Sequence, residues 1–217
     1  TDHPGRLVPG SADACRATWA GRVGRGAVAG SRRPVARSST PAVRIVRGSP
    51  VPAELELLTV GRVSVDLYAE QLGVSMREVR SFRKSVGGTA TNVAVATARL
   101  GHRAAVFTRV GDDPMGDYVR WALHDTFGVD TRYVGLHPAL RTPLAFATME
   151  DPAEPSLLFY REPQAPDMTI ESSEVDPDVV ADVPILWFPT SCLSAEPSRS
   201  TIHDLLGWRE RRTHTVL

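Results

Sequence analysis

From residue 55 onward, short apolar runs alternate with segments in which apolar residues recur at helical spacing. The apolar runs are rich in Leu, Val and Phe and predict buried strands at 55–61, 103–111 and 184–188. The periodic segments predict helices at about 89–101, 117–127 and 195–208. We expect a turn at 112–116 and a serine cap, Ser194 or Ser198, on the last helix. Strands and helices that alternate with short joins predict an α/β fold with a parallel sheet and right-handed crossovers.

The middle of the chain has a different pattern. Two strand-like segments, 142–149 and 156–161, flank a turn-forming stretch rich in Pro, Asp and Glu. This predicts an antiparallel hairpin laid on the α/β body, and hairpins of this kind often cover a site. A further strand start is expected at 213–217, so the final strand has no successor and we expect the domain to be cut short at its carboxyl end.

Residues 1–53 lack hydrophobic periodicity and are dominated by Gly, Pro, Ser, Ala and Arg, which predicts a disordered extension. They hold nine arginines and two acids, a charge of 9 − 2 = +7, so the neutral whole leaves −7 for the remainder. Such a tail is typical of a transit peptide, or of a basic segment that touches RNA or membrane. The folded part, 54–217, is near neutral to acidic, which argues against nucleic acid as its partner.

Two glycines, Gly87 and Gly88, separate an extended segment (79–85) from the helix expected to begin at about Thr89. Glycine permits positive φ and lets another molecule approach the backbone closely. The first turn of a helix has unpaired N–H groups and partial positive charge, and Asn92 adds a donor and an acceptor. The stretch therefore predicts a polar cradle for hydroxyls or an anion, or else a plain strand–turn–helix junction.

Two further side chains are candidates for ligand contacts. Asp66 follows the first predicted strand, at the sheet edge where α/β proteins bind ligands, and could accept two sugar hydroxyls or cap a turn. Arg161 ends the hairpin and carries a planar fork that suits a carboxylate, with a surface ion pair to Glu162 or Asp167 as the alternative.

Several other chemistries lack their sequence signatures. The six histidines show no zinc-ligand spacing, and the chain has no Gly-x-x-x-x-Gly-Lys phosphate loop and no Gly-x-Ser-x-Gly elbow. We therefore predict no metal ligands among its residues. Cys15 and Cys192 make no disulfide framework, which fits a reducing cytoplasm, and no apolar run approaches the roughly 18–20 residues of a membrane span. We expect a cytoplasmic protein without membrane contact.

The pattern around the two glycines resembles the first signature of the PfkB/ribokinase-like sugar kinases. The matching positions are Gly87, Gly88, Asn92, Ala94, Ala98, Leu100, Gly101, Val110, Gly111, Asp113 and Gly116. Asp66 stands where that family keeps its sugar-binding aspartate. The resemblance covers about 55–217, the amino-terminal part of such a kinase. Segments 159–167 and 190–199 are most similar to kinases of 5-dehydro-2-deoxygluconate in inositol catabolism, and next to 2-keto-3-deoxygluconate kinases.

The resemblance implies a doubly wound, mostly parallel sheet with a small β-lid, and often a homodimer through that lid. It implies ATP with Mg²⁺ as phosphate donor and a sugar or sugar acid as substrate. It places Asp66, Gly87, Gly88 and Asn92 on substrate hydroxyls and Arg161 on the carboxylate. The family's second signature, Gly-Ala-Gly-Asp, which carries the catalytic base, does not occur in the chain. We expect that base beyond Leu217 and an inactive chain by itself.

Three other interpretations stay open. The chain could be a sugar-binding module without catalysis, a non-functional truncated product, or a protein whose arginine-rich tail binds nucleic acid. Within the kinase family, 2-keto-3-deoxygluconate kinase or ribokinase specificity is the alternative to the sugar acid named above.

Overall fold

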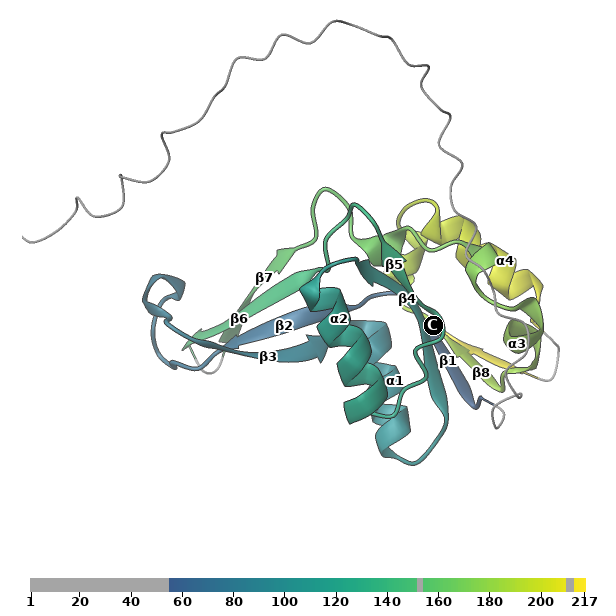
Figure 1. Cartoon of the computed structure of the whole chain (residues 1–217), viewed down its shortest axis with the longest axis horizontal. Helices are drawn as coiled ribbons and strands as arrows, with labels where there is room; N and C mark the ends of the chain where they lie inside the picture. Colours follow the sequence, from purple (N-terminus) through teal and green to yellow (C-terminus); the bar gives the residue numbers. More distant parts are fainter. Residues whose placement is uncertain (1–54, 152–153, 210–212) are drawn as a thin grey trace, which may run out of the picture. The chain divides into compact units, whose positions relative to one another are not determined.

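Two β-sheets organise the part of the chain that the computed structural model describes, which is 55–151, 154–209 and 213–217. The predicted disordered extension over 1–53 lies outside these residues. Figure 1 shows the two sheets with the helices grouped around one of them. The first sheet has five strands in the order β5 (Val134–His137), β4 (Ala104–Gly111), β1 (Leu57–Val60), β8 (Ile185–Trp187) and β9 (His214–Val216).

Every strand pair of the five-stranded sheet is parallel. β1 lies at its centre, where Leu57 pairs with Ala104 of β4 on one side and with Ile185 of β8 on the other. The order 5-4-1-8-9 extends from β1 in both directions, which is the doubly wound arrangement. The predicted parallel α/β fold is confirmed.

Alternate residues of each central strand pack against different helices. Leu58 and Val60 of β1 belong to a buried cluster with side chains of α3 (Pro177–Asp182) and α4 (Ser198–Gly207). Leu57 belongs to a second buried cluster with α1 (Thr89–Arg99) and α2 (Pro114–Trp121). The sheet is therefore covered on both faces, which explains why its strands read as continuous apolar runs.

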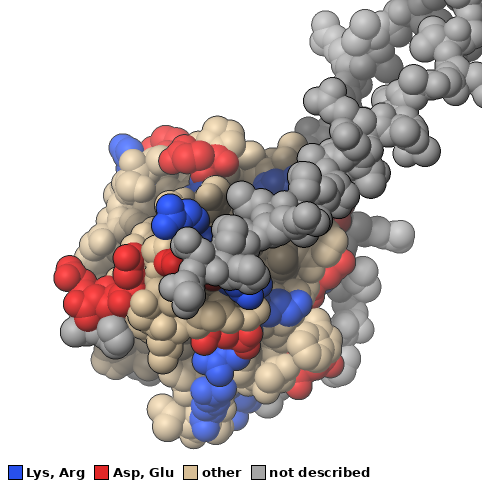
Figure 2. All heavy atoms as spheres, turned by 90° about the vertical axis from the view of Figure 1, so that its left-hand side faces the viewer, with Lys and Arg blue, Asp and Glu red and all other residues tan. Residues whose placement is uncertain are grey.

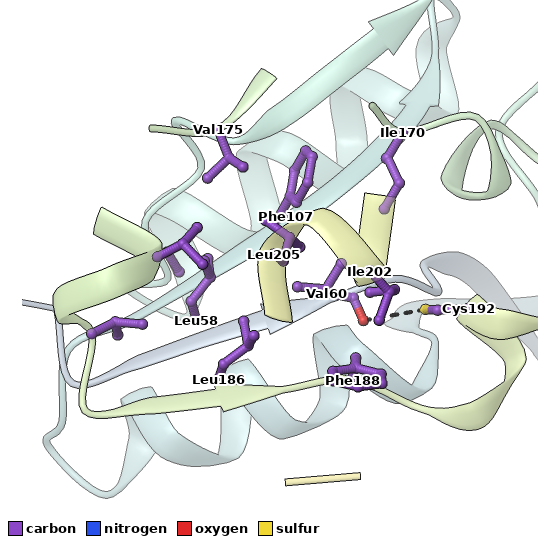
Figure 3. Packing of buried hydrophobic residues seen from close by; sticks show 13 residues of the cluster. Leu58, Val60, Phe107, Ile170, Val175, Leu186, Phe188, Cys192, Ile202 and Leu205 are labelled. Carbon is purple, nitrogen blue, oxygen red and sulfur yellow. Dashed lines mark hydrogen bonds between the residues drawn. The ribbon is translucent and has the colours of Figure 1, made fainter. Parts of the chain in front are cut away.

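The cluster beneath α4 is drawn in Figure 3, where Ile202 and Leu205 point toward Leu58, Val60 and Leu186. Full burial of an aliphatic side chain contributes about 1.5–3 kcal/mol, so this cluster is a principal source of stability. The Cys192 thiol lies at its rim and donates to the Val60 carbonyl at 3.6 Å.

The second sheet, called the lid sheet below, has four strands. In spatial order they are β3 (Phe82–Gly87), β2 (Ser64–Ala69), β6 (Leu144–Asp151) and β7 (Glu154–Tyr160). β6 and β7 are antiparallel, which confirms the predicted hairpin. The hairpin does not stand alone, because β6 pairs in parallel with β2, and β2 pairs antiparallel with β3. Asp66, expected beyond a strand end, lies instead within β2.

Two helix starts differ from the prediction. The stretch expected as a turn before residue 117 already holds the start of α2, because Asp113 caps it and Pro114 occupies the first turn. A π-helical segment, η2 (Ala122–Thr126), completes it. α4 begins at Ser198 rather than near 195, and its N-cap is Pro197. The expected serine cap is absent there, since the Ser198 hydroxyl donates to the Cys192 carbonyl at 2.9 Å.

Short helical turns connect the remaining elements. They are η1 (Met76–Glu78), η3 (Pro166–Met168), η4 (Ser172–Glu174) and η5 (Thr190–Leu193).

Among the residues described, no helix has both the length and the apolar character needed to cross a bilayer. Figure 2 views the end of the molecule at which the lid sheet lies, where basic and acidic side chains are interspersed.

Candidate functional site

A pocket of about 260 Å³ lies between the lid sheet and the amino terminus of α1. Three parts of the chain build it: the connection after β1, one face of the lid sheet, and the first turn of α1. Its lining residues are Arg62, Ser64, Asp66, Tyr68, Gly88, Thr89, Asn92, Ala145, Ala147, Leu157 and Phe159.

The lid sheet contributes alternate residues because successive side chains of a strand point to opposite faces. Along β2 these are Ser64, Asp66 and Tyr68. Asp66 pairs with Ala145 of β6, and Ala145 pairs with Phe159 of β7. One row across three strands thus places a carboxylate, a small residue and an aromatic ring along the same pocket wall. The small alanine in the middle leaves space for a ligand.

Asp66 supplies the carboxylate of the pocket, and two neighbours on its own strand orient it. The Ser64 hydroxyl donates to Oδ1 at 2.7 Å, and the Tyr68 hydroxyl lies 3.5 Å from Oδ2. Partial burial raises the pKa of Tyr68, and the adjacent Asp66 charge acts in the same direction, so this hydroxyl stays a donor. Each oxygen of Asp66 keeps acceptor capacity, which suits a pair of ligand hydroxyls.

The amino terminus of α1 forms the opposite side. Its N-cap is Gly88 at φ 100°, which has no side chain to cap the first N–H groups. A Cβ on Gly88 would lie 2.4 Å from the Arg62 carbonyl, so only glycine fits this close approach. Asn92 is exposed one turn later and lines the pocket beside Thr89. Gly88, the first turn of α1 and Asn92 thus lie on one side of the pocket, and their role in binding polar groups stays a prediction.

Gly87 has a different place from its neighbour. It is not among the lining residues, and a Cβ there would come within 2.0 Å of the Asp66 carboxylate. Gly87 therefore allows Asp66 to pack against the end of β3. Its carbonyl and that of Gly88 also accept from the Thr91 hydroxyl, at 2.5 and 2.9 Å. The structure thus brings Asp66, Gly88 and Asn92 together around the pocket and sets Gly87 behind them.

Arg161 does not line this pocket. Its Nη2 donates to Oδ2 of Asp167 at 2.7 Å, which is the ion pair that the sequence offered as the alternative. Asp167 is buried at 1% exposure, whereas Arg161 is 19% exposed. Burial raises the pKa of Asp167, and the charge of Arg161 opposes that rise. Nη1 of Arg161 and Oδ1 of Asp167 have no hydrogen-bond partner among the described residues.

Arg62 is a pocket residue that the sequence analysis did not single out. Its guanidinium lies over the Phe159 ring, 4.6 Å from the centroid. Partial burial lowers the pKa of Arg62, as does the nearby charge of Arg161, while Asp167 and Asp66 oppose this. The available signal was a period of two: Arg62, Ser64, Asp66 and Tyr68 alternate with apolar residues after the first strand.

Three residues of the glycine-rich pattern serve the fold rather than the pocket. Oδ1 of Asp113 accepts from the backbone of Met115 and Gly116, both at 2.9 Å, and Oδ2 accepts from Thr142 N at 2.8 Å. A Cβ on Gly116 would lie 2.1 Å from the Gly111 carbonyl, so α2 packs directly on the end of β4. Asp113 thereby ties β4, α2 and the segment before β6 together.

No group of three or more His, Cys, Asp or Glu side chains in the described ranges is arranged to hold a metal ion. Asp66 is the one carboxylate among the pocket residues, and its neighbours there are hydroxyl, amide, guanidinium and apolar groups. Magnesium prefers carboxylate and phosphate oxygens with water. The described residues around the pocket do not form a Mg²⁺ site, and we assign none of them to a metal.

A comparison with protein families connects this geometry to known proteins. Residues 54–197 match the model of the pfkB family carbohydrate kinases, a region that contains both the five-stranded sheet's central strands and the lid sheet. The chain belongs to the pfkB family of carbohydrate kinases. The pfkB match includes every residue that lines the pocket.

Individual pfkB relatives carry two kinds of name. The chain is 32% identical over 164 residues to 5-dehydro-2-deoxygluconokinase of Geobacillus kaustophilus, covering 75% of this chain and 48% of that protein. It is 33% identical over 144 residues to probable fructokinase-3 of Arabidopsis thaliana, covering 66% of this chain and 41% of that protein. The chain therefore spans about half the length of the curated relatives it matches.

Solved structures agree with the pfkB assignment. An uncharacterized sugar kinase from Pyrococcus horikoshii superposes with a TM-score of 0.64 at 27% identity, covering 73% of this chain and 53% of that one. The same sugar kinase is also known in complex with ATP, with a TM-score of 0.64 at 28% identity. The fold predicted from the sequence, a ribokinase-like sheet with a β-lid, is thus confirmed.

Proposed function

We propose that the pocket beneath the lid sheet binds the hydroxyl groups of a sugar, and that the chain is the substrate-binding part of a PfkB-type kinase. The orientation of Asp66 is the observation that carries this proposal. Its carboxylate is held by Ser64 and Tyr68 and lies opposite the uncapped turn of α1 and Asn92. Hydroxyls that donate to Asp66 and accept from Asn92 or the Gly88 turn would be matched on both sides.

We propose a sugar acid such as 5-dehydro-2-deoxy-D-gluconate, from inositol catabolism, as the substrate. The names of several relatives support this choice, while fructokinase relatives at similar identity favour a neutral ketose. The sequence placed the carboxylate on Arg161, but Arg161 lies outside the pocket lining and donates to the buried Asp167, so we do not propose it as the carboxylate contact. 2-Keto-3-deoxygluconate and ribose are the alternative substrates within the family.

We propose that the 217-residue chain alone does not transfer phosphate. Phosphoryl transfer needs a base for the attacking hydroxyl and donors for the developing phosphate charge. The chain lacks the Gly-Ala-Gly-Asp sequence that supplies both in the family. ATP and Mg²⁺ are accordingly not assigned to any residue here. A coupled ATPase assay with the purified chain and each sugar should give no turnover, and turnover above background would contradict this part of the proposal.

The binding part of the proposal has a separate test. Isothermal titration of the chain with 5-dehydro-2-deoxy-D-gluconate, fructose and ribose should show saturable binding of at least one of them. Asp66→Ala removes charge-assisted hydrogen bonds that are worth about 1.5–3 kcal/mol each, so binding should weaken at least about tenfold. Asp117→Ala, on an exposed position of α2 outside the pocket, is the matched control and should bind normally. Unchanged binding by Asp66→Ala would contradict the proposal.

A sugar-binding module without catalysis is the second candidate. It has the same pocket and the same dependence on Asp66, and it differs in that no protein containing this chain transfers phosphate. Turnover by a longer protein that includes this chain and a Gly-Ala-Gly-Asp segment would exclude the module. The nucleic-acid alternative concerns residues 1–53, outside the described residues, and it stays a prediction together with the cytoplasmic location.

We also propose that two copies pair through the lid sheet. β7 is exposed along its whole length, and Leu158 and Tyr160 of that strand are on the face away from the pocket. Exposed apolar side chains on an edge strand are a common contact surface. Sedimentation analysis should show a dimer that Leu158→Glu dissociates, and a monomer for the unmodified chain would contradict this pairing.

A further inference from the structure

Arg62 is the one cationic side chain among the pocket residues, all of which lie in the described part of the chain. Within that part, Arg62 forms no ion pair, although Asp66 lines the same pocket. A partly buried guanidinium without a carboxylate partner is unfavourable unless something else offsets its charge. The pocket therefore presents one unpaired positive charge to a ligand.

The contact with Phe159 fixes how that charge is presented. The guanidinium carbon lies over the Phe159 ring, and the described residues accept no hydrogen bond from the guanidinium N–H groups. These N–H groups form a planar fork, the geometry that matches a carboxylate through two parallel hydrogen bonds. A stacked arginine also loses less conformational freedom when it binds, because its orientation is already set.

A second arginine, Arg161, adds positive charge near Arg62 and so favours binding of an anion there. Arg161 lies near enough to Arg62 for its positive charge to lower the pKa of Arg62, while the charges of Asp167 and Asp66 act in the opposite direction. Asp167 is hydrogen-bonded to Arg161 and not to Arg62. An anionic group bound at Arg62 would offset this repulsion.

The strand pairing of the lid sheet separates the Arg62 guanidinium, which lies over Phe159, from the Asp66 carboxylate. Asp66 lies on β2 and Phe159 on β7, with Ala145 of β6 between them in the same row. Two strand spacings separate their backbones, or about 9–10 Å. Side chains reaching inward from both strands leave a span suited to a short chain with hydroxyls at one end and an acid at the other.

From these contacts we infer that Arg62 is the specificity-determining residue of the pocket and selects an anionic sugar by binding its carboxylate. The inference rests on the proposed sugar-binding function and names the substrate class, a sugar acid rather than a neutral sugar. Arg161, paired with Asp167 and outside the lining, acts on Arg62 only through its charge.

The test compares two probes that differ only at the charged group. One is 5-dehydro-2-deoxy-D-gluconate, and the other is the neutral alcohol in which its carboxylate is reduced to CH₂OH. Titration calorimetry of the full chain should show tighter binding of the acid. Arg62→Leu should weaken acid binding at least about tenfold and alcohol binding less than about twofold. Arg62→Lys, which keeps the charge without the fork, should give an intermediate ratio.

Arg99 provides the matched control, because its guanidinium also stacks on a phenylalanine, Phe127, at 5.0 Å, but outside the pocket. Arg99→Leu should leave both affinities unchanged. An equal loss for both probes in Arg62→Leu, or no loss, would overturn the inference while leaving sugar binding intact. If Arg62→Leu does not fold, Arg62→Gln decides by the same ratio. Binding of neither probe by the unmodified chain would contradict the proposed function itself, and the inference with it.

Discussion

Arg161 donates to Asp167 across 2.7 Å, and Asp167 is buried at 1% exposure. The pair connects the end of β7 to the short turn η3 and lies next to the pocket rather than in it. Removing one partner leaves an uncompensated buried charge, which typically costs about 3–5 kcal/mol. Any study of Arg161 in ligand binding must therefore separate the loss of a contact from the loss of stability.

We predict that Arg161→Leu lowers the free energy of unfolding by about 3–5 kcal/mol at pH 7, measured by urea denaturation. Arg161→Leu combined with Asp167→Leu should recover most of this loss, since no buried charge remains. Without Arg161, the pKa of Asp167 rises further, and a raised folded-state pKa costs stability as pH increases above the unfolded value. The defect of the single variant should thus be smaller near pH 4 than at pH 7. Equal stability of the single variant and the unmodified chain would contradict the account of this pair.

Gly88→Ala tests the close approach between α1 and the connection after β1. The added Cβ would meet the Arg62 carbonyl at 2.4 Å, and the φ of 100° is unfavourable for alanine. Gly101→Ala is the control, because its φ of 88° is also positive but its Cβ would meet nothing within 4 Å. The control should cost about 1–2 kcal/mol. Gly88→Ala should cost more and should also weaken sugar binding, and an equal effect of both changes would show that the contact is unimportant.

Asp113→Ala should destabilise the chain by about 1–2 kcal/mol at pH 7 through loss of the α2 cap. Partial burial alone would raise the pKa of Asp113, but hydrogen bonds from Thr142, Gly116 and Met115 lower it below its ordinary value. A lowered folded-state pKa gives stability that is present above the unfolded pKa and lost as pH falls through the folded one. The difference between Asp113→Ala and the parent should therefore shrink below about pH 4. A difference that is constant with pH would rule out the carboxylate as its source.

Cys192 should be chemically inert in the folded chain. Burial raises the pKa of its thiol to about 12, and the negative charge of Asp167 adds to the rise. Thiolate is the reactive form, so alkylation by iodoacetamide, followed by peptide mapping, should label Cys192 at the rate of unfolding. In urea the same residue should react rapidly, which serves as the control. Labelling under native conditions with a midpoint near pH 8–9 would show that the thiol is accessible.

The sequence predicted the elements whose signals are local. The strand at 55–61, the helix after Gly88 and the 142–161 hairpin all follow from short-range patterns, and the structure contains them. β2 pairs with β3 and also with β6, which lies some 80 residues further along the chain. Local sequence patterns do not reveal such a distant pairing, so the four-stranded lid sheet could not be predicted. Asp66 lines the pocket from within strand β2 rather than from beyond a strand end, and its role in substrate binding stays a prediction.

The start of α2 and the partner of Arg161 are two features that the sequence alone could not decide, for different physical reasons. An aspartate followed by proline is compatible both with a turn and with the capped start of a helix. In the structure Asp113 is the helix N-cap, and Thr142 N donates to the same carboxylate and holds it in place. Arg161 had two candidate partners in sequence, and only the position of η3 decided for Asp167. Arg62 could not be identified as a pocket residue from the sequence, because its position depends on contact with Phe159, which lies almost one hundred residues away along the chain.

The central claim is that the space between Asp66, Asn92 and the Gly88 turn is the sugar site. Amide chemical-shift mapping on the ¹⁵N-labelled chain, titrated with 5-dehydro-2-deoxy-D-gluconate, tests it most directly. The account predicts saturable shifts for Asp66, Gly88 and Asn92, with no shifts in the buried cluster of Ile202 and Leu205. Saturable shifts elsewhere, with these three amides unmoved, would contradict it.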